Sequence, residues 1–139
     1  MTNEVFLDTA YAIALAVESD EHHERAEALA DQLEIEATRL VTTRAVLLEI
    51  GNALSKKRYR KAAVELLDAL EQDPQVEIIA LAEELYEPAL ELFRNRMDKE
   101  WGLVDCVSFV VMQERGLTEA LTTDGHFEQA GFRPLLRDK

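Results

Sequence analysis

Hydrophobic positions along the chain form short runs typical of β-strands, separated by longer segments in which apolar residues recur at helical spacing. The strand candidates are residues 4–7, 39–43, 76–81 and 119–123, together with residues 132–136, where the strand pattern is weaker. The helix candidates are residues 9–18, 22–37, 44–57, 60–72, 83–97 and 104–115. Strands that alternate with helices in this way pair in parallel through right-handed crossovers. We therefore expect an α/β fold, a three-layer sandwich whose central, mainly parallel sheet has four to five strands.

Residues that begin or end elements support this organisation. Thr43 can cap the helix candidate that follows it, and Gly116 follows the last helix candidate at a position where a left-handed residue is common. Pro134 restricts the last strand candidate to an edge of the sheet, and Pro88 predicts that its helix starts later or kinks. No internal repeat, low-complexity tract or long linker divides the sequence, so residues 1–139 are interpreted as one domain.

Composition narrows the class of protein. Apolar residues make up 47% and charged residues 31% of the 139 residues, as in a globular domain with one sizeable core. The single cysteine, Cys106, cannot form an internal disulfide, and the N-terminal sequence lacks a basic leader and is interrupted by Glu4 and Asp8. We therefore expect a cytoplasmic protein without a signal peptide or membrane span. Because Cys106 falls within an apolar helix candidate, it is interpreted as a small core residue rather than a nucleophile.

The charge is strongly negative, yet the positive residues are clustered. With 15 Lys and Arg against 28 Asp and Glu, the net charge is −13, which repels polyanions at long range. The densest basic cluster, KKRYRK at residues 56–61, can hold a few phosphates, although a solvated helix end and turn would also explain it. The candidates for phosphate contacts are Arg44, Lys56, Lys57, Arg58 and Arg60.

Four acidic residues from distant parts of the chain each lie next to apolar sequence. Asp8 and Asp124 directly follow strand candidates, and ligands of an open parallel sheet bind beyond the carboxyl ends of its strands. Asp105 begins an otherwise apolar helix candidate, and Glu49 borders the apolar stripe of another. Each acid taken singly is also explained as a helix cap or as a boundary residue that reaches solvent.

A divalent metal would explain the four acids together. Clustered carboxylates repel one another unless protons or a hard cation neutralise them, and Mg²⁺ or Mn²⁺ prefers such oxygen ligands. An acidic metal site usually acts on phosphates, because the metal activates a water molecule and stabilises the charge that develops on a phosphodiester. The pattern therefore indicates a metal centre formed by Asp8, Glu49, Asp105 and Asp124, without a protein nucleophile.

Four segments that contain these acids resemble the PIN domain, and most of all the VapC-type ribonuclease toxins. The segments are VFLDTAYAIAL, VTTRAVLLEIGNAL, WGLVDCVSFVVMQERG and EALTTDGHFEQAGF, and they follow one another in the family's order. The resemblance implies an endoribonuclease that hydrolyses RNA phosphodiester bonds with Mg²⁺ or Mn²⁺ bound by the four acids. It also implies a homodimer and a cognate antitoxin protein that blocks the site.

The resemblance extends to residues around the four acids. Thr123 matches a small hydroxyl residue that would orient carboxylates or water, and Thr9 has a similar implied role or serves in the first turn of its helix. Asp98 resembles an additional acid of the family, with an exposed loop residue as the alternative. Arg44, Lys57 and Arg58 are the basic residues that we assign to the RNA substrate.

Several other residues near these motifs allow two interpretations. His126 is interpreted as a packing residue at a turn or helix start, with contact to a substrate phosphate as the alternative. Trp101 and Tyr11 could stack on RNA bases or anchor the core and loops. His22 and His23 are interpreted as an exposed helix start rather than metal ligands.

Three rival functions differ from the PIN-like interpretation in the residues they need. A phosphoacceptor receiver domain needs an acid pair after its first strand, whereas Asp8 has no acidic neighbour. A haloacid-dehalogenase-like phosphatase needs a second aspartate two residues after the first, whereas Ala10 is found there. A non-catalytic binding module that docks a partner protein through the acidic pocket stays open as the alternative function.

Overall fold

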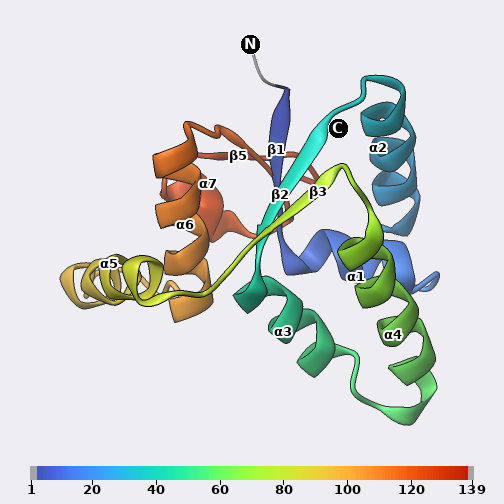
Figure 1. Ribbon diagram of the computed structural model, residues 1–139, viewed down its shortest axis with the longest axis horizontal. Coiled ribbons are helices and arrows are strands. Elements are labelled where there is room, and N and C mark those ends of the chain that lie inside the picture. The colour runs from blue at the N-terminus through green and yellow to red at the C-terminus, as the bar shows by residue number, and fades with distance from the viewer. Residues whose placement is uncertain (1–2, 138–139) are drawn as a thin grey trace.

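The computed structural model describes residues 3–137 and contains a five-stranded sheet in which every pairing is parallel (Figure 1). The strands are β1 (Glu4–Leu7), β2 (Arg39–Thr43), β3 (Val76–Ile79), β4 (Glu119–Leu121) and β5 (Arg133–Pro134). Their order across the sheet is β3-β2-β1-β4-β5. The predicted α/β class and strand number are confirmed.

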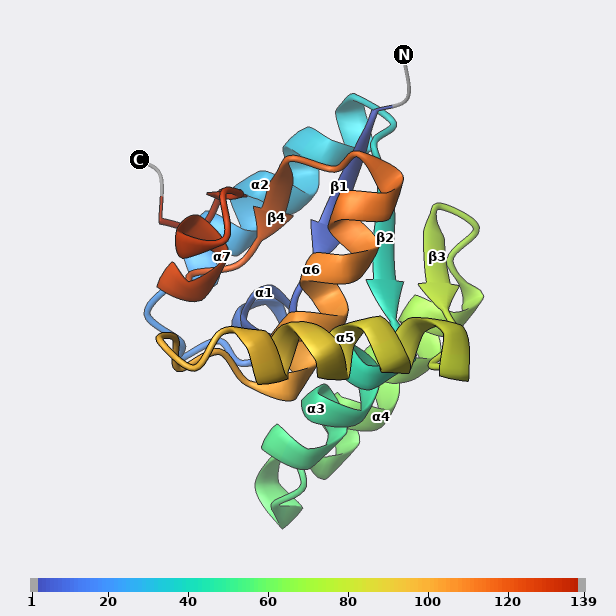
Figure 2. The ribbon, with the colours of Figure 1, turned by 90° about the vertical axis from the view of Figure 1, so that its left-hand side faces the viewer.

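Helices cover both faces of the sheet. The helices are α1 (Thr9–Ala16), α2 (His23–Ile35), α3 (Arg44–Ala53), α4 (Lys57–Gln72), α5 (Glu83–Asn95), α6 (Leu103–Arg115) and α7 (Gly125–Gln129). Figures 1 and 2 show α1, α2 and α4 on one face and α5, α6 and α7 on the other, whereas α3 extends beyond the carboxyl ends of the strands. This is the predicted three-layer sandwich.

The core is densest around the central strand β1. Phe6 and Leu7 are almost fully buried because β1 has a strand on each side and helices above and below it. On the α6 side, the ring of Phe127 lies 6.2 Å from that of Phe6 and 4.9 Å edge-on from that of Phe109. Trp101 continues this cluster at 5.1 Å from Phe109. These aromatic contacts fix the short helix α7 and the segment before α6 against the sheet.

Helix boundaries agree with the predicted caps, except in one connection. The Thr43 hydroxyl accepts a hydrogen bond from Val46 N at 3.2 Å, and Gly116 ends α6 with a left-handed φ of 67°. The break between α3 and α4, however, falls at residues 54–56, whereas the pattern predicted residues 58–59. No glycine or proline marks the observed break, so the hydrophobic pattern alone could not locate it.

The start of α5 and the presence of α7 differ from the sequence prediction. Pro88 does not delay its helix: α5 begins at Glu83 and contains Pro88 in its second turn, at the cost of one backbone hydrogen bond. Helix α7 was not predicted, because its five residues are too short for a periodic pattern. Strand β5 has only two residues and is an edge strand, as Pro134 predicted.

Among the described residues, no helix combines the length and hydrophobicity needed to cross a bilayer.

Candidate metal centre

The chain reverses its direction of travel across the sheet between β1 and β4. From β1 the chain adds β2 and β3 on one side, and it then returns to add β4 and β5 on the other. In open parallel sheets, such a switch point leaves a crevice at the carboxyl ends of the two strands. Asp8 directly follows β1, and its backbone N–H donates to the carbonyl of Leu121, the last residue of β4, at 3.3 Å. Asp124 lies shortly beyond Leu121, so both acids are at this edge.

Asp8 is a buried acid at the centre of the site. Its exposed fraction is 5%, and its Oδ2 accepts a hydrogen bond from Thr122 Oγ1 at 2.7 Å. Burial raises the pKa of Asp8 to about 7, because the charged form is poorly solvated there. The negative charges of Asp105 and Glu49 raise this pKa further, which places both carboxylates within electrostatic reach of Asp8.

Glu49 enters the site from α3. The hydroxyl of Thr9, the first residue of α1, donates a hydrogen bond to Glu49 Oε1. This bond ties the two helices that begin at the carboxyl ends of β1 and β2. Thr9, which also lies in the first turn of α1, thus restricts the orientation of a carboxylate.

Asp105 lies in the first turn of α6. Its Oδ2 accepts from Gly102 N at 3.1 Å, so the residue caps its own helix, as one of the two interpretations expected. Burial of most of the side chain raises the pKa of Asp105, and the charge of Asp124 contributes in the same direction. Asp105 is thus electrostatically coupled to Asp8 on one side and to Asp124 on the other.

Asp124 caps α7 and is connected to Asp8 through Thr122. Its Oδ1 accepts from the backbone N–H of His126 at 2.8 Å, and its own N–H donates to Thr122 Oγ1 at 3.0 Å. The hydroxyl that hydrogen-bonds to Asp8 and to the Asp124 backbone is therefore that of Thr122, one residue before the predicted Thr123. Because successive side chains in an extended segment point in opposite directions, Thr122 is buried while Thr123 turns outward and is only partly buried.

His126 lies between two of the acids, which its interpretation as a packing residue did not anticipate. Its Nδ1 is 3.1 Å from Asp105 Oδ2 and 3.4 Å from Asp124 Oδ1. One ligand atom from each of these three residues lies within 4.8 Å of the others. The sequence places this histidine two residues after Asp124, but only the packing of α7 against α6 brings its ring to Asp105.

The contacts of Asp105 explain how an aspartate fits within an apolar helix. The carboxylate lies at the beginning of the helix and not in its middle. At the beginning of a helix the backbone N–H groups have no partners within the helix and can donate to a carboxylate. The His126 ring and the Gly102 amide both contact Oδ2. A bound metal is therefore not the only compensation available to Asp105.

Other residues selected from the sequence lie outside this cluster. Asp98 lies on the exposed segment between α5 and α6 and forms a two-point ion pair with Arg96 at 3.0 and 3.1 Å. These hydrogen bonds from Arg96 lower the pKa of Asp98 to about 2. Lys57 and Arg58 begin α4, at the far end of α3 from the sheet edge. Because α3 has ten residues, its far end, where this basic patch begins, is about 15 Å from Arg44 at its start.

Two arginines lie close in the fold to segments that carry the acids, one on α3 itself and one beside α7. Arg44 begins α3 at the carboxyl end of β2, and it pairs with Glu71 at 3.0 Å. Arg137, which was not selected from the sequence, lies against Gly125: a side-chain carbon at Gly125 would be 2.9 Å from its Nη1. A glycine immediately after Asp124 thus leaves room for a guanidinium beside α7.

The aromatic residues and the cysteine belong to the interior. Trp101 and Tyr11 are 6% and 2% exposed, which removes their faces from contact with RNA bases and supports the anchoring interpretation. Trp101 Nε1 also donates to Gln129 Oε1 at 3.0 Å. Cys106 is fully buried, and burial raises the pKa of its thiol, as expected for a core residue.

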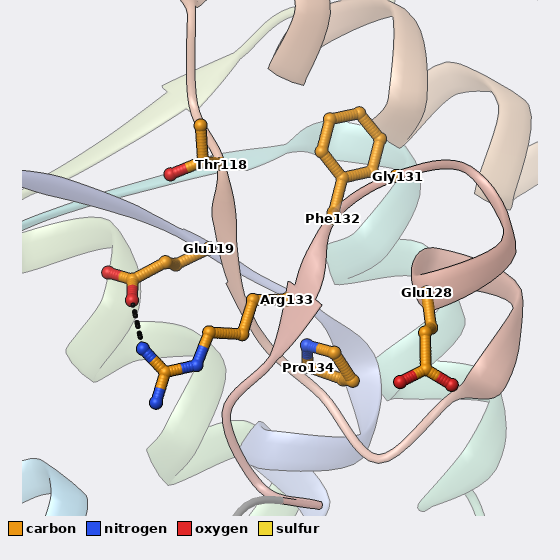
Figure 3. Close-up of a pocket in the computed structure, with 7 residues that line it drawn as sticks. All are labelled: Thr118, Glu119, Glu128, Gly131, Phe132, Arg133 and Pro134. Carbon is orange, nitrogen blue, oxygen red and sulfur yellow. Dashed lines mark hydrogen bonds and ion pairs between the residues drawn. The ribbon is translucent and has the colours of Figure 1, made fainter.

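Two hollows on the described surface do not contain the four acids. One, of about 530 Å³, lies along β4 and β5, and two of its lining residues, Glu119 and Arg133, form a 3.1 Å ion pair (Figure 3). The other, of about 640 Å³, is an apolar groove lined by residues of α1, α2, α4 and the neighbouring strands, including Leu15, Leu33 and Leu66. Neither provides an alternative acidic centre.

An open parallel α/β sheet with acidic side chains at its switch point defines the class of α/β domains that bind ligands at the carboxyl edge of the sheet. Within this class, the model of the PIN domain matches residues 5–133. The chain therefore belongs to the PIN-domain family, as the four sequence segments indicated.

Relatives within the family are VapC proteins. The chain is 30% identical over 129 residues to the 23S rRNA-specific endonuclease VapC20 of Mycobacterium tuberculosis, covering 92% of this chain and 95% of that protein. The crystal structure of VapC20, described as a Sarcin-Ricin loop cleaving toxin, matches with a TM-score of 0.81 at 29% identity over 92% of this chain and 95% of that one. VapBC2 of Rickettsia felis, bound to a DNA fragment from its promoter, matches in fold with a TM-score of 0.68 at 15% identity over 94% and 96%.

Proposed function

We propose that this protein is a metal-dependent endoribonuclease and the toxin of a toxin–antitoxin pair. The observation that supports the proposal is that ligand atoms of Asp105 and Asp124 lie within 4.8 Å of each other, while the charges of Asp105 and Glu49 act on the buried Asp8. We assign all four acids, which come from four separate segments, to one site. The coupled pKa shifts of Asp8 and Asp105 support this proximity. Carboxylates gathered in this way favour a divalent cation that takes the place of protons.

The donor set fits Mg²⁺ or Mn²⁺, which take oxygen ligands and retain several waters. We assign Asp8, Asp105 and Asp124 to the direct binding of the metal, with Glu49 as the fourth acid. When bound, the metal would supply an activated water and neutralise charge on the phosphodiester. Thr9 and Thr122 donate hydrogen bonds that hold Glu49 and Asp8 in one orientation, so these carboxylates need little rearrangement before they act.

The RNA approaches the acidic edge with the help of local positive charge. Arg44 begins α3, the helix that carries Glu49, and Arg137 lies against Gly125, which follows Asp124; we assign both arginines to phosphates that flank the scissile bond. Lys57 and Arg58, at the start of α4, would extend this contact beyond the far end of α3. Such phosphate contacts offset the repulsion between RNA and a protein of net charge −13.

For the substrate, we propose 23S ribosomal RNA. The support is the similarity to VapC20, which is named for that RNA and which this chain matches over 92% of its length. We further propose a basic antitoxin segment as the partner that blocks the site, since the acidic cluster and the net negative charge complement it.

The test is cleavage of total cellular RNA by the purified protein with Mg²⁺, Mn²⁺ or EDTA, followed by mapping of the fragment ends. We expect discrete, metal-dependent cuts within 23S rRNA for the wild type and for Asp68→Asn, a matched change at an acid of α4 outside the site. Asp124→Asn should remove these cuts while its thermal melt stays cooperative. Absence of cleavage under either metal, with metal binding still measurable by calorimetry, would replace this proposal with the binding-module function.

A further inference from the structure

His126 is a nitrogen donor placed within an otherwise oxygen-only set of side chains. Its Nδ1 faces the same two carboxylate oxygens, Asp105 Oδ2 and Asp124 Oδ1, that are available to a metal. The His126, Asp105 and Asp124 side chains are 32%, 16% and 35% exposed, so an ion can reach all three from solvent.

The spacing of these atoms is close to that of ligand atoms in a coordination shell. In an octahedral site with bonds of about 2.1 Å, adjacent ligand atoms are about 3.0 Å apart and opposite ones about 4.2 Å apart. The observed separations from Nδ1 are 3.1 and 3.4 Å, and the three ligand atoms all lie within 4.8 Å of one another. A metal could therefore be bound with only small movements of the side chains.

The backbone around His126 is held firmly, which favours a fixed ligand over an adaptable surface side chain. Its N–H donates to Asp124 Oδ1 at 2.8 Å, and the next residue, Phe127, is fully buried between Phe6 and Phe109. The ring is thus attached to the same rigid turn that positions Asp124.

We infer that His126 is a direct ligand of the divalent metal through Nδ1, together with Asp105 and Asp124. The inference rests on the proposed metal-dependent function and deepens it. In the bound state, Nδ1 gives its lone pair to the metal and the ring proton resides on Nε2. Because imidazole suits transition metals whereas Mg²⁺ prefers oxygen ligands, His126 makes the site selective for Mn²⁺ over Mg²⁺.

Pulsed electron paramagnetic resonance of the Mn²⁺-loaded protein tests this ligand directly. We expect the nitrogen modulation of a bound imidazole in the wild type, and its replacement by a ¹⁵N signal when the three histidines of the chain are ¹⁵N-labelled. The signal should disappear in His126→Asn and persist in His22→Asn, the matched change at a histidine in the loop before α2. A wild-type spectrum without imidazole coupling would overturn the inference.

Calorimetry of the same variants supplies a second readout. In His126→Asn, we expect the Kd for Mn²⁺ to increase about tenfold or more and the Kd for Mg²⁺ by no more than about threefold. Equal weakening of both metals would contradict a nitrogen ligand and indicate a general loss of site geometry, which a thermal melt would register.

The outcomes separate this inference from the proposed function. Wild-type protein that cleaves RNA but lacks the nitrogen coupling would refute the His126 ligand and leave the nuclease standing. Nitrogen coupling without RNA cleavage under any metal would refute the nuclease and leave the ligand standing.

Discussion

The Thr122 hydroxyl donates to the carboxylate of Asp8 at 2.7 Å across the junction of β1 and β4. The same oxygen accepts from the backbone N–H of Asp124 at 3.0 Å, so one neutral side chain fixes both acids that follow the two strands of the switch point. This hydrogen bond also opposes the effect of burial on Asp8, because it stabilises the charged carboxylate.

Replacing Thr122 by the isosteric valine is therefore expected to damage the site. The change leaves Asp8 Oδ2 and Asp124 N without their partner, which should lower the free energy of unfolding by roughly 1 to 3 kcal/mol. Metal affinity measured by calorimetry should fall as well. Thr123→Val is the matched control, and it should stay close to the wild type in both measurements. Equal behaviour of the two valine variants would contradict the role assigned to Thr122.

Asp8 should make the metal-free protein less stable as the pH rises. The folded pKa of Asp8 is about 7 against an ordinary value of 3.8, so the unfolded chain releases its proton first and stability falls between these values. An asparagine side chain cannot ionise, and hence Asp8→Asn should gain roughly 2 to 3 kcal/mol relative to wild type between pH 5 and pH 8. Urea unfolding in EDTA at the two pH values measures this difference. A difference that does not change with pH would show that Asp8 titrates normally.

The basic patch at the start of α4 should contribute to RNA affinity through phosphate contacts. Neutralising Lys57 and Arg58 to glutamine is expected to reduce the slope of log affinity against log salt by up to about 1.4. Binding is measured in the Asp124→Asn background, which prevents cleavage. Arg39→Gln is the comparison, because Arg39 begins β2 at the opposite edge of the sheet from the acids. An unchanged slope in the double variant would remove this patch from the RNA path.

The homodimer that the family resemblance implied stays a prediction, and exposed apolar residues near α5 are where we expect its interface. Phe93 is 44% exposed and Met97 is 89% exposed. Phe93→Glu with Met97→Glu should convert a dimer into a monomer in light scattering coupled to size exclusion. Ile35→Glu, at an 85% exposed residue of α2 on the other face of the sheet, should remain dimeric. A wild-type monomer would refute the prediction.

Local sequence contained most of the information about the fold. The parallel sheet followed from alternating strand and helix patterns, and the buried strands around Phe6 and Val41 were visible as apolar runs. The break between α3 and α4 was misplaced, because a change of helix direction without glycine or proline depends on tertiary packing. Helix α7 was missed for a related reason, since five residues held by Phe127 have no period to detect.

The four acids could be proposed as a site from the sequence, whereas the side chains that contact them could not be identified from it. An acid after a strand is recognisable, because parallel strands end at one edge. Which hydroxyl contacts Asp8 depends on the direction in which each side chain of the extended segment after β4 points. In the structure it is Thr122, and not Thr123, that points toward Asp8. The approach of His126 to Asp105 depends on the packing of α7 against α6, which joins residues 21 positions apart.

Because of the order of strands in the sheet, the site depends on two segments that are far apart in the sequence. Asp8 and Asp124 come from segments near opposite ends of the chain, yet only two residue pairs, Phe6 with Ala120 and Leu7 with Leu121, align β1 with β4 beside them. A proteolytic cut that released β4 and α7 would take away Asp124 and His126 and leave Asp8 exposed. The metal binding that we propose would therefore depend on a chain that is intact from β1 to α7.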